Sequence, residues 1–367
     1  MVLSAVIFII TLLVLVLIHE FGHFLVAKKF GIKVEEFGFG IPPRLWGKKI
    51  GETLYSINWL PFGGFVKLLG EDEVDTIMVS KKDKSRDFRV KSVWQRIAVV
   101  VAGVAMNLIL AWVLLYIVII AQNFKIIYPT LEPAVYIAQV ENNFPAQKAG
   151  VQPGEKLEAV DNQKVSDIDT ARKLIKSKDE KPVTLTLADS DGRNPRKISV
   201  TPQKQPNGDV LIGVVFSPIP FREYQTVPQK LFSGITYSWD LVRLTFAGLG
   251  RLLHDLIYGN FGAASQSVSG PVGLAVVTND ILSSGGLATV ILPYLWFVGV
   301  ISLTLSVFNV LPIPALDGGR LLFLVIEAVT GKKVKEDVEK NVHMIGFIIL
   351  LALAVLITFS DIRKLLP

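Results

Sequence analysis

The segment that decides the fold is Val2-Leu3-Ser4-Ala5-Val6-Ile7-Phe8-Ile9-Ile10-Thr11-Leu12-Leu13-Val14-Leu15-Val16-Leu17-Ile18, followed directly by His19-Glu20-Phe21-Gly22-His23. The first part is apolar apart from two hydroxyls, and together the two parts exceed the ~20 residues that a bilayer-spanning helix needs. Ionisable side chains in such a helix are costly and therefore indicate a functional site. The segment predicts a first transmembrane helix that carries a polar site near its end.

The polar part has the spacing H-E-x-x-H. On a helix, His19 and His23 lie four residues apart and share one face. Two imidazoles at this spacing can occupy two corners of a tetrahedral zinc site, and Glu20 beside them can act as general base toward water. The alternative is a pair of core histidines with a stray carboxylate. The cost of polar groups in a membrane favours the metal site.

The composition indicates an integral membrane protein. Mean hydropathy is +0.48, and 51% of the residues are hydrophobic. The net charge of +6 does not indicate a nucleic-acid-binding protein, because the basic residues crowd into loops beside apolar helices. Cysteine is absent, so a metal ion would have to be held by His, Asp or Glu.

Long apolar runs predict four transmembrane helices, at about residues 2–26, 93–121, 287–311 and 342–359. Lysine and arginine are concentrated in 28–91 and again in 332–340. By the positive-inside rule both stretches are cytoplasmic, which places residues 122–218 outside. The chain then divides into residues 1–121 with two helices and a β-loop, 122–218 as an extracytoplasmic domain, 219–286 as amphipathic interfacial helices, and 287–367 with the last two helices.

Two glycine-rich, aromatic pieces lie in the first basic loop, at 37–43 and 54–66. Glycines and β-forming residues at this density predict strands and tight turns. The strands are apolar enough to enter the membrane as a hairpin, and a small cytoplasmic sheet is the alternative. In the second span, Asn107 is polar at membrane depth, and we leave open whether it makes an interhelical hydrogen bond or belongs to a site.

A catalytic zinc site needs a third protein ligand. Because His254 and His343 are isolated, a carboxylate is expected, and Asp317 follows two prolines and precedes two glycines at the end of the third span. This places its carboxylate on the same side of the membrane as His19 and His23. The alternative is that Asp317 caps the helix predicted for 320–330. The pairing with H-E-x-x-H favours the ligand role.

Charge, proline and glycine increase between about residues 123 and 218, where the pattern predicts a soluble β-rich module. It predicts turn, strand and turn over 145–162, a helix over 168–175, and strands over 183–187 and 197–201. The spacing A-x-x-A-G-V-x-P-G-E-x-L-x-x-V-D, which begins at Ala146, resembles that of bacterial PDZ domains.

The four features H-E-F-G-H, Gly38-Phe39-Gly40, the PDZ-like insert and the element N-x-x-P-x-P-x-L-D-G from Asn309 cover nearly the whole chain. With them the chain resembles the site-2 protease family of intramembrane zinc metalloproteases, in the bacterial branch that cleaves anti-sigma factors. The resemblance implies a polytopic α-helical membrane protein with about four transmembrane helices, a membrane-associated β-hairpin and an inserted β-rich PDZ domain.

The resemblance also implies roles for individual residues. Zn²⁺ would be held by His19, His23 and Asp317, and Glu20 would be the catalytic base. The residues implied to contact substrate are Asn309, Gly38, Phe39, Gly40, Phe62, Gly63, Gly64 and, in the PDZ domain, Gly213.

The implied enzyme cleaves single-pass transmembrane substrates, including anti-sigma factors or signal-peptide remnants, in the bacterial inner membrane. It is multi-pass, with its metal site toward the cytoplasmic side; its partners are these substrates and the lipid bilayer, and not nucleic acid. Two other functions are considered, a membrane metal carrier and a scaffold that presents the PDZ domain without protease activity. A carrier would not explain Glu20 or an inserted PDZ module, and the intact set His19, Glu20, His23 and Asp317 argues against a scaffold.

Overall fold

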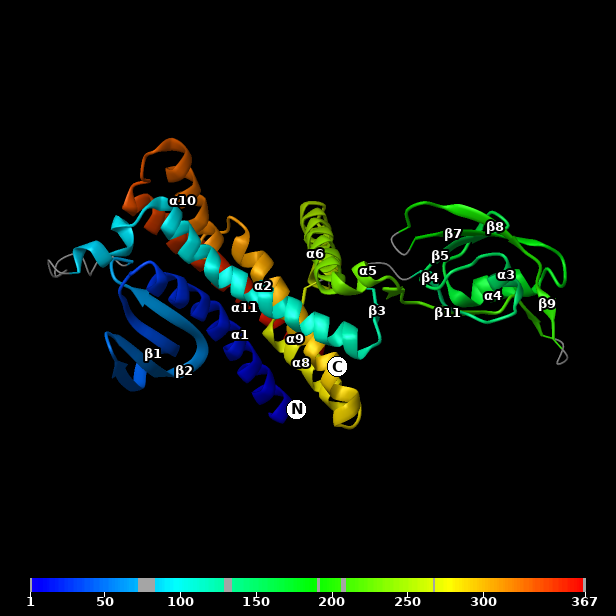
Figure 1. Ribbon diagram of the computed structural model, residues 1–367, viewed down its shortest axis with the longest axis horizontal. Helices are drawn as coiled ribbons and strands as arrows, with labels where there is room; N and C mark the ends of the chain where they lie inside the picture. The colour runs from blue at the N-terminus through cyan, green and yellow to red at the C-terminus, as the bar shows by residue number, and fades with distance from the viewer. Residues whose placement is uncertain are drawn as a thin grey trace. The chain divides into compact units, whose positions relative to one another are not determined.

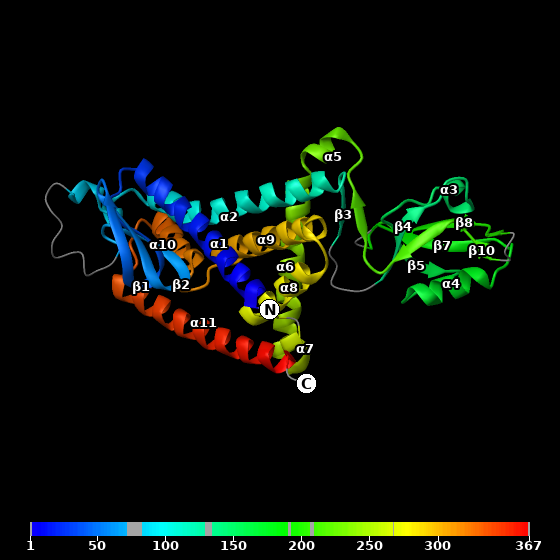
Figure 2. The same cartoon turned by 90° about the horizontal axis from the view of Figure 1, so that it is seen from below.

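The computed structural model describes residues 2–71, 83–128, 134–189, 192–205, 209–266 and 268–365. The chain forms two compact units. One comprises residues 1–115 and 249–367, and the other comprises 116–248. The first unit is a helical bundle with a twisted β-hairpin, and the second is a β-rich module with short helices (Figures 1 and 2).

The helices of the bundle are α1 (Val2–Lys29), α2 (Val93–Ala121), α7 (Phe261–Gln266), α8 (Pro271–Ser283), α9 (Leu287–Val310), α10 (Asp317–Thr330) and α11 (Glu336–Leu365). Among the described residues, four helices are long and apolar enough to cross a membrane: 2–29, 93–121, 289–310 and 337–365. The four predicted spans are therefore confirmed. The first and last helices extend further than hydropathy alone predicted, because each continues into charged residues at one or both ends.

Close packing of α1 against α2 depends on a glycine. A Cβ on Gly22 would lie 2.3 Å from the carbonyl oxygen of Ala102, so only glycine permits this approach. On the other side of α2, the Ser302 hydroxyl of α9 donates to the backbone carbonyl of Asn107 at 2.8 Å. The interhelical hydrogen bond at Asn107 is thus made by its backbone, and its buried side-chain oxygen has no partner among the described residues.

The segment Ser269-Gly270-Pro271-Val272-Gly273 had no role predicted from sequence. It begins α8, and the buried Asp361 carboxylate of α11 accepts from the backbone N–H groups of Gly270 and Gly273, both at 2.8 Å. A side chain from a distant helix therefore caps α8. The segment 219–286 was expected to hold amphipathic interfacial helices, but α8 is apolar and packs against α1, α9 and α11.

The predicted strands form β1 (Val34–Ile50) and β2 (Thr53–Leu68), which pair with each other beside α1 (Figure 1). Both strands bend, so Phe37 pairs with Tyr55 on one side and with Val66 on the other. The hairpin is therefore four segments wide, in the order 44–50, 53–58, 34–39 and 64–68. No strand among the described residues pairs with the outer side of 64–68, which makes this segment an open edge.

Exposed apolar side chains cover the far part of the hairpin, among them Leu45, Trp46 and Trp59, each more than half exposed. An exposed apolar surface of this kind favours contact with lipid over a solvated cytoplasmic sheet. The hairpin is also anchored to α1. The ring of Phe24 in α1 contacts the ring of Phe37 edge-to-face, with 5.4 Å between the two ring centroids.

The strands of the second unit are β3 (Lys125–Ile127), β4 (Val135–Val140), β5 (Lys156–Val160), β6 (Gln163–Lys164), β7 (Val183–Ala188), β8 (Arg196–Val200), β9 (Gln203–Lys204), β10 (Val210–Leu211), β11 (Val214–Ser217) and β12 (Phe221–Glu223). Its helices are α3 (Pro145–Lys148), α4 (Ile168–Lys176), α5 (Val227–Leu231) and α6 (Ser233–Ile257), which continues into the first unit.

The main sheet has the order β11-β4-β5-β7-β8, with β6 paired to β5. Its core includes Ile137, Leu157, Leu185 and Ile175 of α4, all buried. The predicted helix and strands of this module are confirmed. The predicted turns of 145–162 lie at 149–154 and 161–162, on either side of β5. One turn of helix that was not predicted precedes them, because Pro145 stands at its first position, where its fixed φ and missing N–H are favourable.

Candidate metal centre

Three side chains converge between α1 and α10. The Nε2 atoms of His19 and His23 lie 3.1 Å apart, and Oδ2 of Asp317 lies 2.8 Å from the first and 3.3 Å from the second. The helix spacing brings the imidazoles together, and the chain reversal before α10 brings the carboxylate to them. Three donor atoms within 4.8 Å can hold one metal ion, and a His₂-carboxylate set is one that zinc accepts.

The ring orientation of His23 is fixed by the backbone of α2. Its Nδ1 lies 2.8 Å from the carbonyl oxygen of Val99, so Nδ1–H donates and Nε2 is left with its lone pair toward the centre. Oδ2 of Asp317 is buried, and apart from the two imidazoles it has no hydrogen-bond donor among the described residues. Both observations fit a divalent cation held at this point.

Asp317 is the first residue of α10, and Leu316 stands at the N-cap position. The capping role considered for Asp317 is therefore absent. The approach of Asp317 to the histidines needs a tight reversal after Pro312 and Pro314. A Cβ on Gly318 would lie 1.9 Å from the carbonyl oxygen of Leu311, which explains why glycine follows the aspartate.

The sequence did not point to Gly103 of α2 as part of the centre. A Cβ at this position would lie 2.3 Å from Nε2 of His23 and 2.9 Å from Cε1 of His19. The missing side chain is therefore what leaves room for both imidazoles. The one glycine of the span, in Ala102-Gly103, was the available signal, because small residues mark close contacts between membrane helices.

Glu20 lies in a cavity of about 210 Å³ that also includes His23 and Asp317. The open edge of the hairpin passes this cavity. A Cβ on Gly64 would lie 3.5 Å from Cγ of Glu20, and Phe65 and Val66 line the same space. The Glu20 carboxylate, the ligands His23 and Asp317 and an unpaired strand edge thus meet at one place.

The other predicted substrate contacts have different positions. Gly38 and Phe39 pair with the open edge, at Phe65 and Gly64, and Gly40 has φ +77° with its backbone against Leu60. Gly63 also has positive φ, whereas the side chain of Phe62 lies outside the described structure.

Asn309 is half-buried in the last turn of α9, and its side chain makes no hydrogen bond among the described residues. Gly213 belongs to the second unit, where φ +78° and contact with Phe144 require glycine. Neither residue is part of the three-ligand cluster.

Asn58 is a buried residue of the hairpin whose role the sequence did not predict. Its amide nitrogen donates to the carbonyls of Phe39 and Gly40, at 3.2 and 3.1 Å. It therefore fixes the bend that turns the Gly38–Gly40 segment toward the open edge.

Comparison with known proteins assigns the chain to a family. The sequence profile described as Peptidase family M50 matches residues 7–353. The chain belongs to peptidase family M50. A putative zinc metalloprotease of Clostridium acetobutylicum is 36% identical over 353 residues, covering 95% of this chain and 94% of the relative. A second from Clostridium perfringens is 33% identical and covers 95% of both chains.

A relative with a more specific name is the regulator of sigma-W protease RasP of Bacillus subtilis, 29% identical with 98% of both chains covered. Among solved structures, the PDZ domain of an SdrC-like protein from Listeria monocytogenes covers 24% of this chain, with 17% identity and a TM-score of 0.21. At that score the structural likeness carries no argument.

As an M50 member, the chain is an intramembrane zinc metalloprotease, a hydrolase embedded in the membrane by several helices. The predicted family, activity and cofactor are confirmed. The alternatives of a metal carrier and a catalytically silent scaffold are set aside. The three donor groups that the sequence singled out, with Glu20 beside the centre, fit the cofactor that the family uses.

Gly103→Ala should remove zinc from the centre. The new methyl group would push both imidazoles away, and we expect affinity for zinc to fall about tenfold or more, as happens when groups that orient metal ligands are changed. Two measurements test this loss of zinc. They are the zinc content of the purified protein, by elemental mass spectrometry, and its cleavage of a transmembrane substrate. Gly250→Ala is the matched control, because open space surrounds Gly250. Zinc content and cleavage within twofold of wild type would contradict the role of Gly103.

Proposed function

We propose that the centre formed by His19, His23 and Asp317 hydrolyses peptide bonds within the transmembrane segments of single-pass membrane proteins, with Glu20 as general base. One observation carries this proposal. Glu20, which lies in a membrane-spanning helix, shares a cavity with the ligands His23 and Asp317, and an open strand edge passes beside this cavity.

The open edge supplies what a transmembrane substrate needs. A helix in the membrane satisfies its own backbone hydrogen bonds, so its peptide bonds become accessible only after local unwinding. An extended segment can recover these bonds by adding as a strand to an exposed sheet edge. Residues 64–68 provide such an edge, and Gly64 keeps it free of a side chain where it passes Glu20.

The chemical roles follow from the arrangement of the side chains. Zinc, when bound, polarises the scissile carbonyl and lowers the pKa of water. Glu20 accepts the proton of the attacking water and passes it to the leaving amine. The carbonyl of Val99 keeps His23 in the tautomer that a metal ligand needs. The side-chain amide of Asn309 can hold the backbone of the extended substrate, and Gly38–Gly40 and 62–64 form the wall against which it lies.

Glu20→Gln should abolish cleavage while zinc stays bound, because the amide cannot accept the proton although it keeps the size of the side chain. General base catalysis contributes ~10²–10⁴-fold, so cleavage of a transmembrane reporter should drop by at least about a hundredfold. Asp317→Asn is the contrasting variant and should lose both zinc and activity. Near wild-type cleavage by the Glu20 variant would rule out the base role, and unchanged zinc content in the Asp317 variant would rule out the ligand role.

The substrate class is proposed from the relatives. The relative from Bacillus subtilis is named for regulation of sigma W. We therefore propose anti-sigma factors, or the membrane remnants of signal peptides, as substrates. Either would expose a single spanning segment to a site within the bilayer.

The orientation in the membrane is proposed from charge. The basic stretches 28–91 and 332–340 flank α1, α2, α10 and α11, and the Lys333 ammonium donates to the carbonyl of Arg89. They therefore lie at the same end of the helices, and the positive-inside rule makes that end cytoplasmic. The metal site lies about 9 Å along α1 from that end, at 1.5 Å per residue between His23 and Lys29.

With this orientation the β-rich module, residues 122–218, lies outside the cytoplasm. A reporter enzyme that is active only in the cytoplasm, inserted next to the exposed turn at Gly192, should give no signal. The same reporter inserted after Gly331 should be active and serves as the control. Strong activity at Gly192 would reverse the topology.

We propose that the β-rich module acts as a filter that keeps substrates with intact outer domains from the membrane site. A docking receptor alone would not protect an intact substrate from a protease that is always present. The alternative, a receptor for the new C-terminus of a trimmed substrate, would use β-augmentation and the turn at Gly213.

Replacing residues 134–217 by a flexible linker separates the two roles. As a filter, the module is not needed for catalysis, so the variant should cleave intact substrates and still cleave trimmed ones at a similar rate. Cleavage of both forms is compared by gel in cells that express wild type or variant. Slower cleavage of trimmed substrate, with intact substrate still uncut, would identify a receptor instead.

A further inference from the structure

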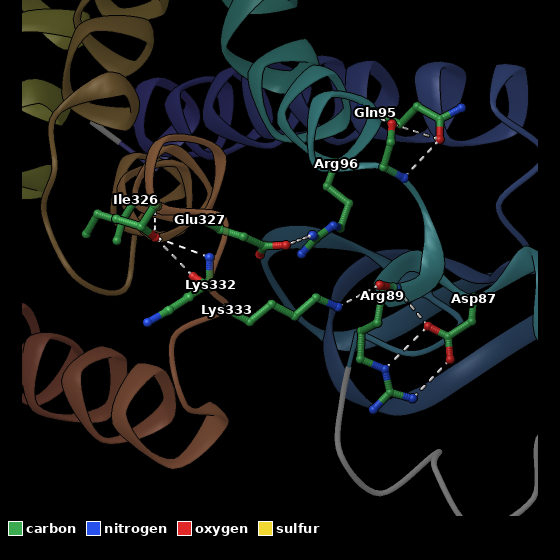
Figure 3. Close-up of polar contacts among 10 residues, drawn as sticks. Asp87, Arg89, Gln95, Arg96, Ile326, Glu327, Lys332 and Lys333 are labelled. Carbon is green, nitrogen blue, oxygen red and sulfur yellow. Dashed lines mark hydrogen bonds and ion pairs between the residues drawn. The ribbon is translucent and has the colours of Figure 1, made fainter.

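A second and larger cavity, of about 800 Å³, lies where α2 and α11 begin and α10 ends. It neighbours the catalytic cavity, with which it shares Glu71, Phe88, Val100 and Arg320. The proteolytic mechanism uses none of its remaining side chains. Figure 3 shows part of its wall, with Arg96 of α2 facing Glu327 of α10 and Lys333 reaching toward Arg89.

Cationic side chains outnumber carboxylates in the wall of this cavity. Its cationic side chains are Lys67, Arg89, Arg96, Arg320, Lys333 and Lys340, and its carboxylates are Glu71, Glu327 and Glu339. Two of these carboxylates are already engaged, Glu71 by Arg320 and Glu327 by Arg96. Two of the cations also pair with carboxylates next to the lining, Lys67 with Glu35 and Arg89 with Asp87. Six cationic groups against these five carboxylates leave a small positive excess, which favours an anion.

Two buried donors in this wall have no acceptor. The side chain of Arg96 is only 8% exposed, and its Nε–H has no partner among the described residues, although a terminal nitrogen binds Glu327. Nδ1 of His343 accepts from the backbone N–H of Ala315 at 2.9 Å, so the proton of the neutral ring is on Nε2. This Nε2–H is buried and also without an acceptor among the described residues.

Donors without acceptors in a cationic wall specify the chemistry of a ligand. Such a ligand presents several oxygen acceptors, carries negative charge and needs no donor of its own. A phosphate group has these properties, and guanidinium groups are well suited to it.

We propose that this cavity binds the phosphate headgroup of an anionic phospholipid. Two candidate membrane spans begin here, at Val93 and Asp337, so the cavity lies at the level of a membrane surface. Met344 and Phe347 of α11 line it and are themselves 53% and 59% exposed. The polar wall therefore continues into an apolar surface along which acyl chains can lie, an arrangement typical of basic headgroup pockets between membrane helices.

Neighbouring lysines provide a matched pair of variants. The Lys333 ammonium lines the cavity and donates to the carbonyl of Arg89 at 3.1 Å. Lys332 precedes it in the chain but does not line the cavity, and among the described residues only its backbone is hydrogen-bonded, with its N–H donating to the Thr330 hydroxyl at 3.3 Å. The two changes Lys333→Ala and Lys332→Ala remove the same charge from adjacent positions, and only the first removes it from the site.

The test measures lipid binding to the full-length protein in detergent by native mass spectrometry. Phosphatidylglycerol is titrated against zwitterionic phosphatidylcholine. We expect wild type to prefer phosphatidylglycerol by about tenfold or more, since each charge-assisted hydrogen bond accounts for a substantial part of such a factor. Arg96→Lys combined with His343→Phe keeps the ion pair with Glu327 and removes both unpartnered donors. It should abolish the preference, Lys333→Ala should reduce it several-fold, and Lys332→Ala should leave it within twofold.

Each other outcome overturns the proposal. Equal binding of the two lipids by wild type, or an unchanged preference in the double variant, would show that no headgroup site exists here. If inorganic phosphate at millimolar concentration binds the lipid-free protein and displaces phosphatidylglycerol, the cavity is a site for a free anion. If the double variant keeps the lipid preference but binds a transmembrane substrate peptide more weakly, the cavity belongs to the substrate path instead. If the double variant does not fold, His343→Phe alone and the two lysine variants decide the question by the same measurement.

Discussion

The structure depends on the cost of placing ionisable side chains inside a membrane-spanning helix. His19, Glu20 and His23 lie in α1, where a lone polar group would have no water to bind. The protein meets this constraint by bringing a carboxylate, Asp317, and a backbone carbonyl, that of Val99, to the two imidazoles. The neighbouring elements α10 and α2 are therefore placed so that these two groups contact the imidazoles.

The elements around the metal centre reach it because their backbones approach one another closely. Gly22 lets α1 contact α2, Gly103 makes room for the imidazole rings, and Gly318 allows the chain to reverse before α10. Gly64 brings a strand edge against Glu20 in the same way. Because glycine has no Cβ, helix, strand and turn can all lie within contact distance of one metal centre.

Charge is organised at one end of the bundle. The Arg96–Glu327 pair joins α2 to α10, and the Arg320–Glu71 pair joins α10 to the end of the hairpin. These pairs connect the helix that carries Asp317 to both the bundle and the hairpin. A largely buried ion pair such as Arg96–Glu327 contributes less to stability than to a defined arrangement. The Arg320–Glu71 pair lines both the catalytic cavity and the larger basic cavity beside it.

The sequence by itself determined the four spans, the hairpin strands and the residues His19, Glu20, His23 and Asp317 as a candidate centre. Hydropathy, helical spacing and turn residues are local, so they can be recognised along the chain. Only the tertiary structure decided that Asp361 caps α8 and that the hairpin is four segments wide with one open edge. It also decided the space at Gly103 and the unpartnered donors of the basic cavity. These features join residues far apart in the chain, and their distances follow from packing, which no local pattern encodes.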